Sequence, residues 1–190
     1  MIYVVQLLAL GLGAVIGSQL PDIDQWLWFL AGSHRSILTH SALIPWGLYS
    51  LAQGRMPWWH WFGGGLAAAL AAHFARDMFP AGWYGFALIS VPFVGRLSGT
   101  LSLLWLLFTV VACWYLALLL IRQRSEVLML WVAALIGFGT DYSRNGGENL
   151  MPMLALAAGY VVAICLPNPV VNGRVLFHRW YDNLMRSLGR

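Results

Sequence analysis

The sequence predicts an all-α protein, a polytopic membrane helix bundle of about six transmembrane helices followed by a C-terminal amphipathic helix. Of the 190 residues, 60% are hydrophobic and only 9% are charged, whereas a soluble domain has roughly 25% charged residues. A helix that crosses a bilayer needs about 20 apolar residues, so six helices with short loops account for the length. This composition excludes a soluble enzyme domain and a nucleic-acid-binding protein.

The apolar runs divide a single membrane domain, residues 1–190, into its parts. Six runs predict the helices, at residues 2–18, 37–52, 58–79, 101–121, 127–140 and 150–166. The third run contains the small-residue stretch Gly63 to Ala69, which lets helix backbones approach closely and marks this helix as the packed centre. Segment 80–99 is apolar but interrupted by Gly and Pro, which predicts a re-entrant or interfacial piece. The tail, residues 167–190, predicts an interfacial amphipathic helix.

All eleven basic residues are Arg, so the distribution of Arg between the loops predicts how the chain is oriented in the membrane. Assigned alternately to the two sides, the loops and tail place seven Arg on the side of both termini and four on the other side. The richer side is expected to be cytoplasmic. Loops 19–36, 80–99 and 141–149 then face outward, and the last is either an ordinary polar hairpin or a cover over the outer end of the bundle.

Rare acidic and histidine side chains gather at this outer end. Three of the seven acids and three of the five His fall there: Asp22, Asp24, His34, His40, His73 and Asp77. His40 is expected about one turn into the second helix, and His73 and Asp77 are four apart and share a helix face. Because a charged group inside a span costs roughly 2.5 to 3.5 kcal/mol, a divalent metal is the expected partner. Ligands without Cys favour Zn, with Mn or Fe as alternatives, as one ion or two.

Each of these residues also has an ordinary interpretation. Asp22 and Asp24 follow Pro21, where Asp often caps a turn. His73 and Asp77 could form a buried hydrogen-bonded pair or a proton relay, and Arg35 and Arg76 could be interfacial side chains. His60 lies in an aromatic belt at the opposite interface and His178 lies in the tail, so neither is a ligand candidate. Cys113 and Cys165 lie in apolar runs and are read as small hydrophobic residues.

These residues match a known pattern. The string from Gly17 to Asp24, then His34-Arg35, Thr39-His40-Ser41 and His73-x-x-x-Asp77, resembles the YdjM-like (LexA-regulated) family of bacterial inner-membrane metal-dependent hydrolases. The resemblance covers roughly residues 11–80. It implies a multi-helix membrane protein with a divalent-metal hydrolase site built from those Asp and His positions.

The predicted activity is metal-dependent hydrolysis of a phosphoester or phosphoanhydride bond in a lipid, of phospholipase or lipid phosphatase type, at the periplasmic side. Asp24 or Asp77 is expected to be the general base, and Arg35 and Arg76 to bind phosphate. Thr39 and Ser41 are expected to orient His40 or to bind an oxygen. Three alternatives stay open: hydrolysis of a peptide or acyl amide bond, an ion-coupled transporter, and a non-catalytic scaffold stabilised by metal. A membrane lipid is the expected partner, and nothing indicates a protein partner.

Overall fold

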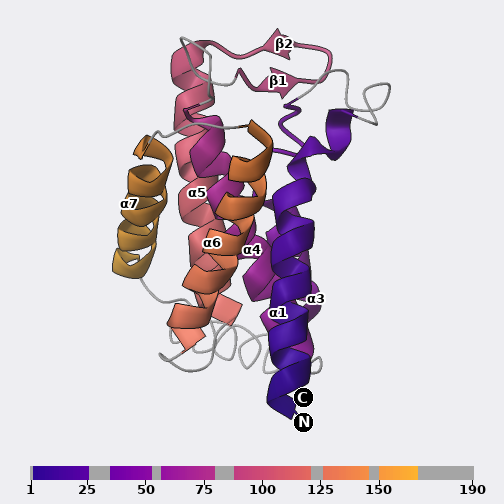
Figure 1. Cartoon of the computed structure of the whole chain (residues 1–190). Coiled ribbons are helices and arrows are strands. Elements are labelled where there is room, and N and C mark those ends of the chain that lie inside the picture. Colours follow the sequence, from indigo (N-terminus) through magenta and orange to yellow (C-terminus); the bar gives the residue numbers. More distant parts are fainter. Residues whose placement is uncertain are drawn as a thin grey trace, which may run out of the picture.

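A computed structural model describes residues 2–25, 35–52, 57–79, 88–120, 126–145 and 150–166 (Figure 1). Its elements are α1 (Ile2–Gln19), the 3-10 helix η1 (Pro21–Gln25), α3 (Leu43–Ala52), α4 (Pro57–Asp77), β1 (Ser90–Val91), β2 (Gly95–Arg96), α5 (Gly99–Leu120), α6 (Glu126–Asn145) and α7 (Met151–Cys165). The described residues thus contain six α-helices, one for each predicted apolar run, and the all-α prediction is confirmed. The expected tail helix at 167–190 lies outside the described residues.

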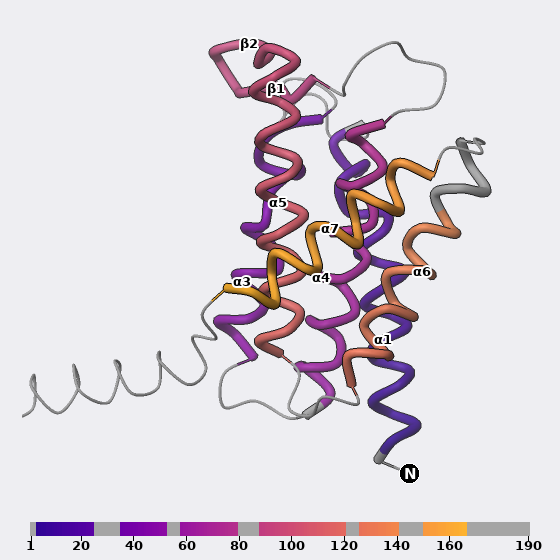
Figure 2. Tube along the Cα trace, turned by 90° about the vertical axis from the view of Figure 1, so that its left-hand side faces the viewer, coloured from indigo at the N-terminus to yellow at the C-terminus, as the bar shows by residue number. Residues whose placement is uncertain are grey.

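Helix α4 lies at the centre of the bundle. It packs against α1, α3, α5, α6 and α7, and both views show it enclosed by these helices (Figures 1 and 2). Every residue from 63 to 75 is buried, so no side of this stretch faces outward. A helix enclosed on every side needs small side chains where neighbours are close, which confirms the central position predicted from Gly63 to Ala69.

Glycines set the distance between α1 and α4. A methyl group added at Gly13 would collide with the main-chain oxygen of Phe62, and one added at Gly65 would collide with the main-chain oxygen of Leu10. One added at Gly17 would lie 2.5 Å from the main-chain oxygen of Leu66. The two backbones are therefore in direct contact over much of α1, and this contact positions the end of α1 next to His73.

The outward surface of the bundle is apolar. Large exposed hydrophobic side chains lie on α1, α3, α5, α6 and α7, among them Leu8, Leu12, Trp46, Leu104, Phe108, Leu128, Leu135, Leu154 and Val161. Polar side chains lie inside instead: Ser102 and Thr109 of α5 are fully buried. This distribution is the reverse of that in a soluble protein, which rarely exposes extended apolar patches.

Among the described residues, α5 alone is long and apolar enough to cross a membrane, with 22 residues and a mean hydropathy of 2.4 over its most apolar window. Shorter apolar helices occur at Tyr3–Gln19, Leu43–Ala52, Glu126–Thr140 and Met151–Cys165. The described structure therefore has the expected six helices. Among them, α5 has both the length and the hydropathy of a membrane span.

Two predicted helix boundaries are wrong, and one predicted segment contains an element that was not expected. The second helix begins at Leu43 and not at residue 37, so His40 lies in the preceding turn, where Asp24 accepts hydrogen bonds that hold the chain out of a helix. Helix α6 continues to Asn145, so the first half of the expected 141–149 loop is helical. Within segment 80–99, residues 90–96 form the antiparallel β1–β2 hairpin, which keeps the predicted irregular character but pairs its backbone within the protein.

Candidate metal centre

Four segments meet at one end of the bundle to form the site. The end of α1 contributes the main chain of Ser18, and η1 contributes Asp22 and Asp24. The turn before α3 contributes His40, and the last turns of α4 contribute His73 and Asp77. Pro21 begins η1 directly after α1, so the chain changes direction here and brings its two Asp back over the end of α4.

The tautomer of His73 is fixed by the main chain. This ring is 5% exposed, and its Nδ1 lies 3.2 Å from the carbonyl oxygen of Ser18. A carbonyl oxygen only accepts hydrogen bonds, so Nδ1 must carry the hydrogen and donate it. The Nε2 atom of the neutral ring then presents a lone pair, which is the form that binds a metal.

The tautomer of His40, which is fully buried, is fixed through a hydroxyl group. Thr39 Oγ1 lies 2.7 Å from Asp24 Oδ2 and 3.1 Å from the carbonyl oxygen of Ser36. Both oxygens only accept, so the single hydroxyl hydrogen is directed at one of them. Towards His40 Nδ1, at 3.1 Å, the hydroxyl oxygen is therefore the acceptor and the ring nitrogen the donor. His40 Nε2 also presents a lone pair.

Two carboxylates face these lone pairs. Asp77 Oδ2 lies 3.1 Å from Nε2 of His40 and 3.5 Å from Nε2 of His73, and Asp22 Oδ1 lies 4.0 Å from Nε2 of His73. One ligand atom from each of Asp22, His40 and His73 falls within 4.8 Å of the others. Lone pairs and carboxylate oxygens at such distances repel one another unless a cation lies between them or an imidazole carries a second proton. The donor set therefore fits a divalent cation of the kind that imidazole and carboxylate favour.

Asp77 has two different environments at its two oxygens. Oδ1 lies 3.6 Å from the guanidinium of Arg35. Oδ2 is buried and makes no hydrogen bond within the described part of the chain, although it is the atom closest to both imidazoles. A buried carboxylate oxygen in this state is costly unless an ion or a proton comes to it.

Asp24 lies on the far side of the His40 ring. Its side chain is fully buried, and Oδ2 accepts hydrogen bonds from the main-chain N–H of Ser36 at 2.9 Å and from Thr39. The same oxygen lies 3.6 Å from Nδ1 of His40, whereas the metal would lie beside Nε2. This is the arrangement of a carboxylate that orients a metal-binding histidine from behind.

Arg35 is held in place by the β1–β2 hairpin. Its carbonyl oxygen accepts from the main-chain N–H of Ser90 at 2.9 Å, and its φ of 62° lies in the left-handed region. The guanidinium Nε is buried without a hydrogen bond in the described structure. Arg76 points elsewhere, with its guanidinium carbon 5.9 Å from the centre of the Phe138 ring.

The structure therefore gathers most of the predicted site residues. Asp22, Asp24, His40, His73 and Asp77 come together with Arg35 and Thr39 beside them. Ser41 Oγ donates to the carbonyl oxygen of Leu38 at 3.1 Å. His34 and the side chains of the 141–149 segment lie outside the described residues.

Sequence reasoning missed the main-chain contacts of the site. The carbonyl oxygen of Ser18, the N–H of Ser36 and the carbonyl oxygen of His40 all take part, and the last accepts from the indole N–H of Trp105 at 2.7 Å. Main-chain groups are present in every residue, so a sequence does not reveal which of them take part in a site. Trp105 alone offered a signal, as a partly buried indole N–H usually finds an acceptor.

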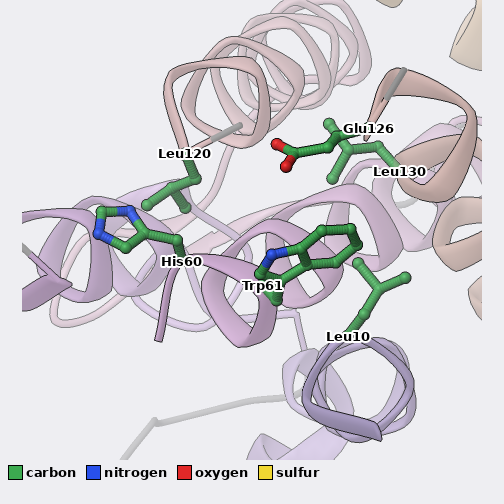
Figure 3. Close-up of a pocket in the computed structure, with 6 residues that line it drawn as sticks. All are labelled: Leu10, His60, Trp61, Leu120, Glu126 and Leu130. Carbon is green, nitrogen blue, oxygen red and sulfur yellow. The ribbon is translucent and has the colours of Figure 1, made fainter. Parts of the chain in front are cut away.

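A small hollow lies at the other end of the bundle (Figure 3). It is lined by Leu10, His60, Trp61, Leu120, Glu126 and Leu130, and it has space for one water molecule at most. His60 precedes His73 by 13 residues on α4, which separates them by about 20 Å along the helix. His60 is therefore not part of the metal centre, as predicted.

Comparison of the chain with protein-family models, curated proteins and solved structures finds no match. The chemistry of the site is therefore the basis for assigning a function.

Proposed function

We propose that this protein is a membrane-embedded, divalent-metal-dependent hydrolase that cleaves a phosphoester or phosphoanhydride bond of a lipid at the periplasmic side of the bacterial inner membrane. Asp22, His40 and His73 hold the ion, which is Zn²⁺ in our proposal. The observation that carries the proposal is the pair of imidazoles whose Nδ1 atoms donate hydrogen bonds, so that both Nε2 lone pairs meet beside two carboxylates.

The membrane placement rests on the apolar outer surface and on α5. Leucine, valine and phenylalanine side chains on α1, α5, α6 and α7 face outward, where lipid can cover them without cost. The 22-residue α5 is about 33 Å long, enough for a bilayer core of about 30 Å. The Arg distribution favours cytoplasmic termini, and in the multi-pass arrangement that we propose the metal centre would lie on the periplasmic side.

The chain's own groups divide the catalytic work. A bound divalent metal would lower the pKa of water towards about 7 and polarise the scissile group. Asp77 Oδ2, buried and without a hydrogen bond in the described structure, accepts the proton of the attacking water. Arg35, which contacts Oδ1 of the same carboxylate, provides the cation for a phosphate oxygen. Asp24 and Thr39 act as positioning residues because they keep His40 in one tautomer and orientation.

The proposed phosphate chemistry follows from the charge beside the metal. Asp22, Asp24 and Asp77 together carry one negative charge more than a divalent metal neutralises, and the Arg35 guanidinium offsets this excess beside the site. This cation favours an anionic phosphate substrate. The depth of the site at the end of α4 favours a lipid, since a headgroup at the membrane surface reaches this level without leaving the bilayer.

The test measures metal content and product release separately. The protein is purified, stripped with chelator and reloaded with Zn²⁺, and phosphate or headgroup release is followed on phospholipids and prenyl phosphates. We expect one Zn²⁺ per chain for the wild type and for the control His60→Ala, and loss of Zn²⁺ in His73→Ala. Asp77→Asn is expected to keep Zn²⁺ and to lose turnover.

Each other result changes the assignment. Full turnover by His73→Ala contradicts the catalytic role of the centre, and loss of Zn²⁺ from Asp77→Asn makes Asp77 a ligand and removes it as the base. Zn²⁺ retained without turnover on the lipid panel favours a metal-stabilised scaffold. Metal-dependent ion flux across vesicles without product favours a transporter.

A further inference from the structure

The β1–β2 hairpin ends in a tight turn whose side chains are apolar. Val91 pairs with Gly95, and the N–H of Val94 donates to the carbonyl oxygen of Val91 at 3.1 Å. Pro92 and Phe93 occupy the two central positions, and Phe93 has a φ of 65°. Glycine is the residue that this second central position favours when φ is positive.

The side chain of Phe93 makes no packing contact in the described structure that would offset the cost of this backbone conformation. Its side chain is fully exposed, at 110% of the reference area, and Val94 is 80% exposed. An aromatic ring in a strained position that covers no part of the protein does not stabilise the described structure. Its contribution must come from something outside that structure.

The position of the hairpin indicates what that partner is. Only Leu97 and Ser98 separate β2 from Gly99, the first residue of α5, and Figure 1 shows the hairpin at the level of that end of the helix, at the top of the bundle. The end of a membrane-spanning helix lies at the level of the headgroups. Arg96, exposed on β2, adds a cation for lipid phosphates. Aromatic and basic side chains together are typical of segments at this level.

The hairpin is also tied to the metal centre by main-chain hydrogen bonds. Ser90 donates to the carbonyl oxygen of Arg35 at 2.9 Å and accepts from the N–H of Ile37 at 2.8 Å. Arg35 in turn contacts Asp77. The apolar tip and the site are therefore parts of one connected unit, and where the tip sits fixes the level of the site.

We propose that the hairpin tip, Pro92 to Val94, inserts into the boundary between headgroups and acyl chains of the leaflet on which the metal centre opens. The site then receives its lipid from that same leaflet. The lipid substrate rests on the proposed function, whereas the insertion itself requires only that α5 spans the membrane.

The experiment measures membrane depth by spin labelling in nanodiscs of phosphatidylethanolamine and phosphatidylglycerol. Cys165→Ser removes the exposed thiol, and Cys113 is buried. Single Cys variants at Phe93 and, separately, at Val94 carry a nitroxide. Labels at the exposed α5 positions Thr100, Leu104 and Phe108 form a depth scale, as each residue advances about 1.5 Å along the helix.

We expect the labels at Phe93 and Val94 to lie about 5 to 10 Å below the phosphates, accessible to oxygen and protected from a water-soluble nickel chelate. Labels in water at both hairpin positions, with a normal depth gradient along α5, overturn the insertion and leave the membrane placement standing. A flat α5 series in water overturns the membrane placement itself and the insertion with it. Hairpin labels protected from both reagents overturn lipid insertion in favour of contact with a second copy of the chain.

Discussion

Replacing Thr39 with Val tests whether a hydroxyl group orients His40 in the candidate metal centre. Val has nearly the same shape but cannot donate to Asp24 or accept from His40, which lie 2.7 Å and 3.1 Å from Thr39 Oγ1. His40 Nδ1 is then left with Asp24 Oδ2 at 3.6 Å, beyond normal hydrogen-bond length. The ring loses its fixed tautomer, so part of the population presents N–H instead of a lone pair to the metal.

The expected loss is a 10- to 100-fold weaker Zn²⁺ affinity, about the range for outer-shell partners of metal ligands, or about 1.4 to 2.7 kcal/mol. Competition with a chromophoric zinc chelator at fixed pH measures this affinity for the protein in detergent. Ser41→Ala is the matched control, because Ser41 also neighbours His40 but its hydroxyl donates to the carbonyl oxygen of Leu38. If Thr39→Val, with unchanged helix content, binds Zn²⁺ within about twofold of the control, outer-shell control of His40 is refuted.

Three further predictions concern packing and the site. Gly13→Ala on α1 is expected to destabilise the protein by about 1 to 3 kcal/mol, since the added methyl collides with α4. The control Gly11→Ala, with open space around it, is expected to be neutral or slightly stabilising. The free energies of unfolding of the two variants are compared in mixed micelles. His73→Ala is expected to weaken Zn²⁺ binding by more than the roughly 100-fold upper limit for an outer-shell partner, and an equal metal content at micromolar Zn²⁺ would contradict its role as a ligand. Arg35→Ala is expected to lower kcat/KM on an anionic phospholipid by about 10- to 100-fold, the loss of one charged hydrogen bond, with unchanged Zn²⁺ stoichiometry; Arg35→Lys should recover part of it.

The helices could be predicted from the sequence because their signals are local. Apolar runs gave all six helices, and the glycine and alanine run from 63 to 69 gave the central one. The start of α3 could not be predicted, because the apolar run that begins at Ile37 does not show at which residue the helix itself begins. A carboxylate 12 residues earlier, Asp24, accepts from the N–H of Ser36 and holds the chain in a turn. Contacts between distant segments override local preference in such places.

The members of the site could be predicted but their separate tasks could not. The scarcity of Asp and His in an apolar chain indicated Asp22, His40, His73 and Asp77 together. Nothing in their spacing distinguished Asp24, which lies behind the His40 ring, from Asp22, which lies in front of His73. The different positions of the two Asp depend on the direction of η1, and this direction is set where the chain turns after the end of α1 at Gln19.

The acceptor for His73 is a main-chain atom, and this has a mechanical consequence. No substitution at Ser18 removes its carbonyl oxygen, so an alanine scan of α1 would leave this half of the site undetected. What alters it is a sliding of α1 along α4, and next to Ser18 the two backbones touch through Gly17. In the membrane placement proposed above, a thinner or thicker bilayer changes helix tilt and moves that oxygen relative to the imidazole. The orientation of His73 in the proposed metal centre would thereby depend on the thickness of the membrane around it.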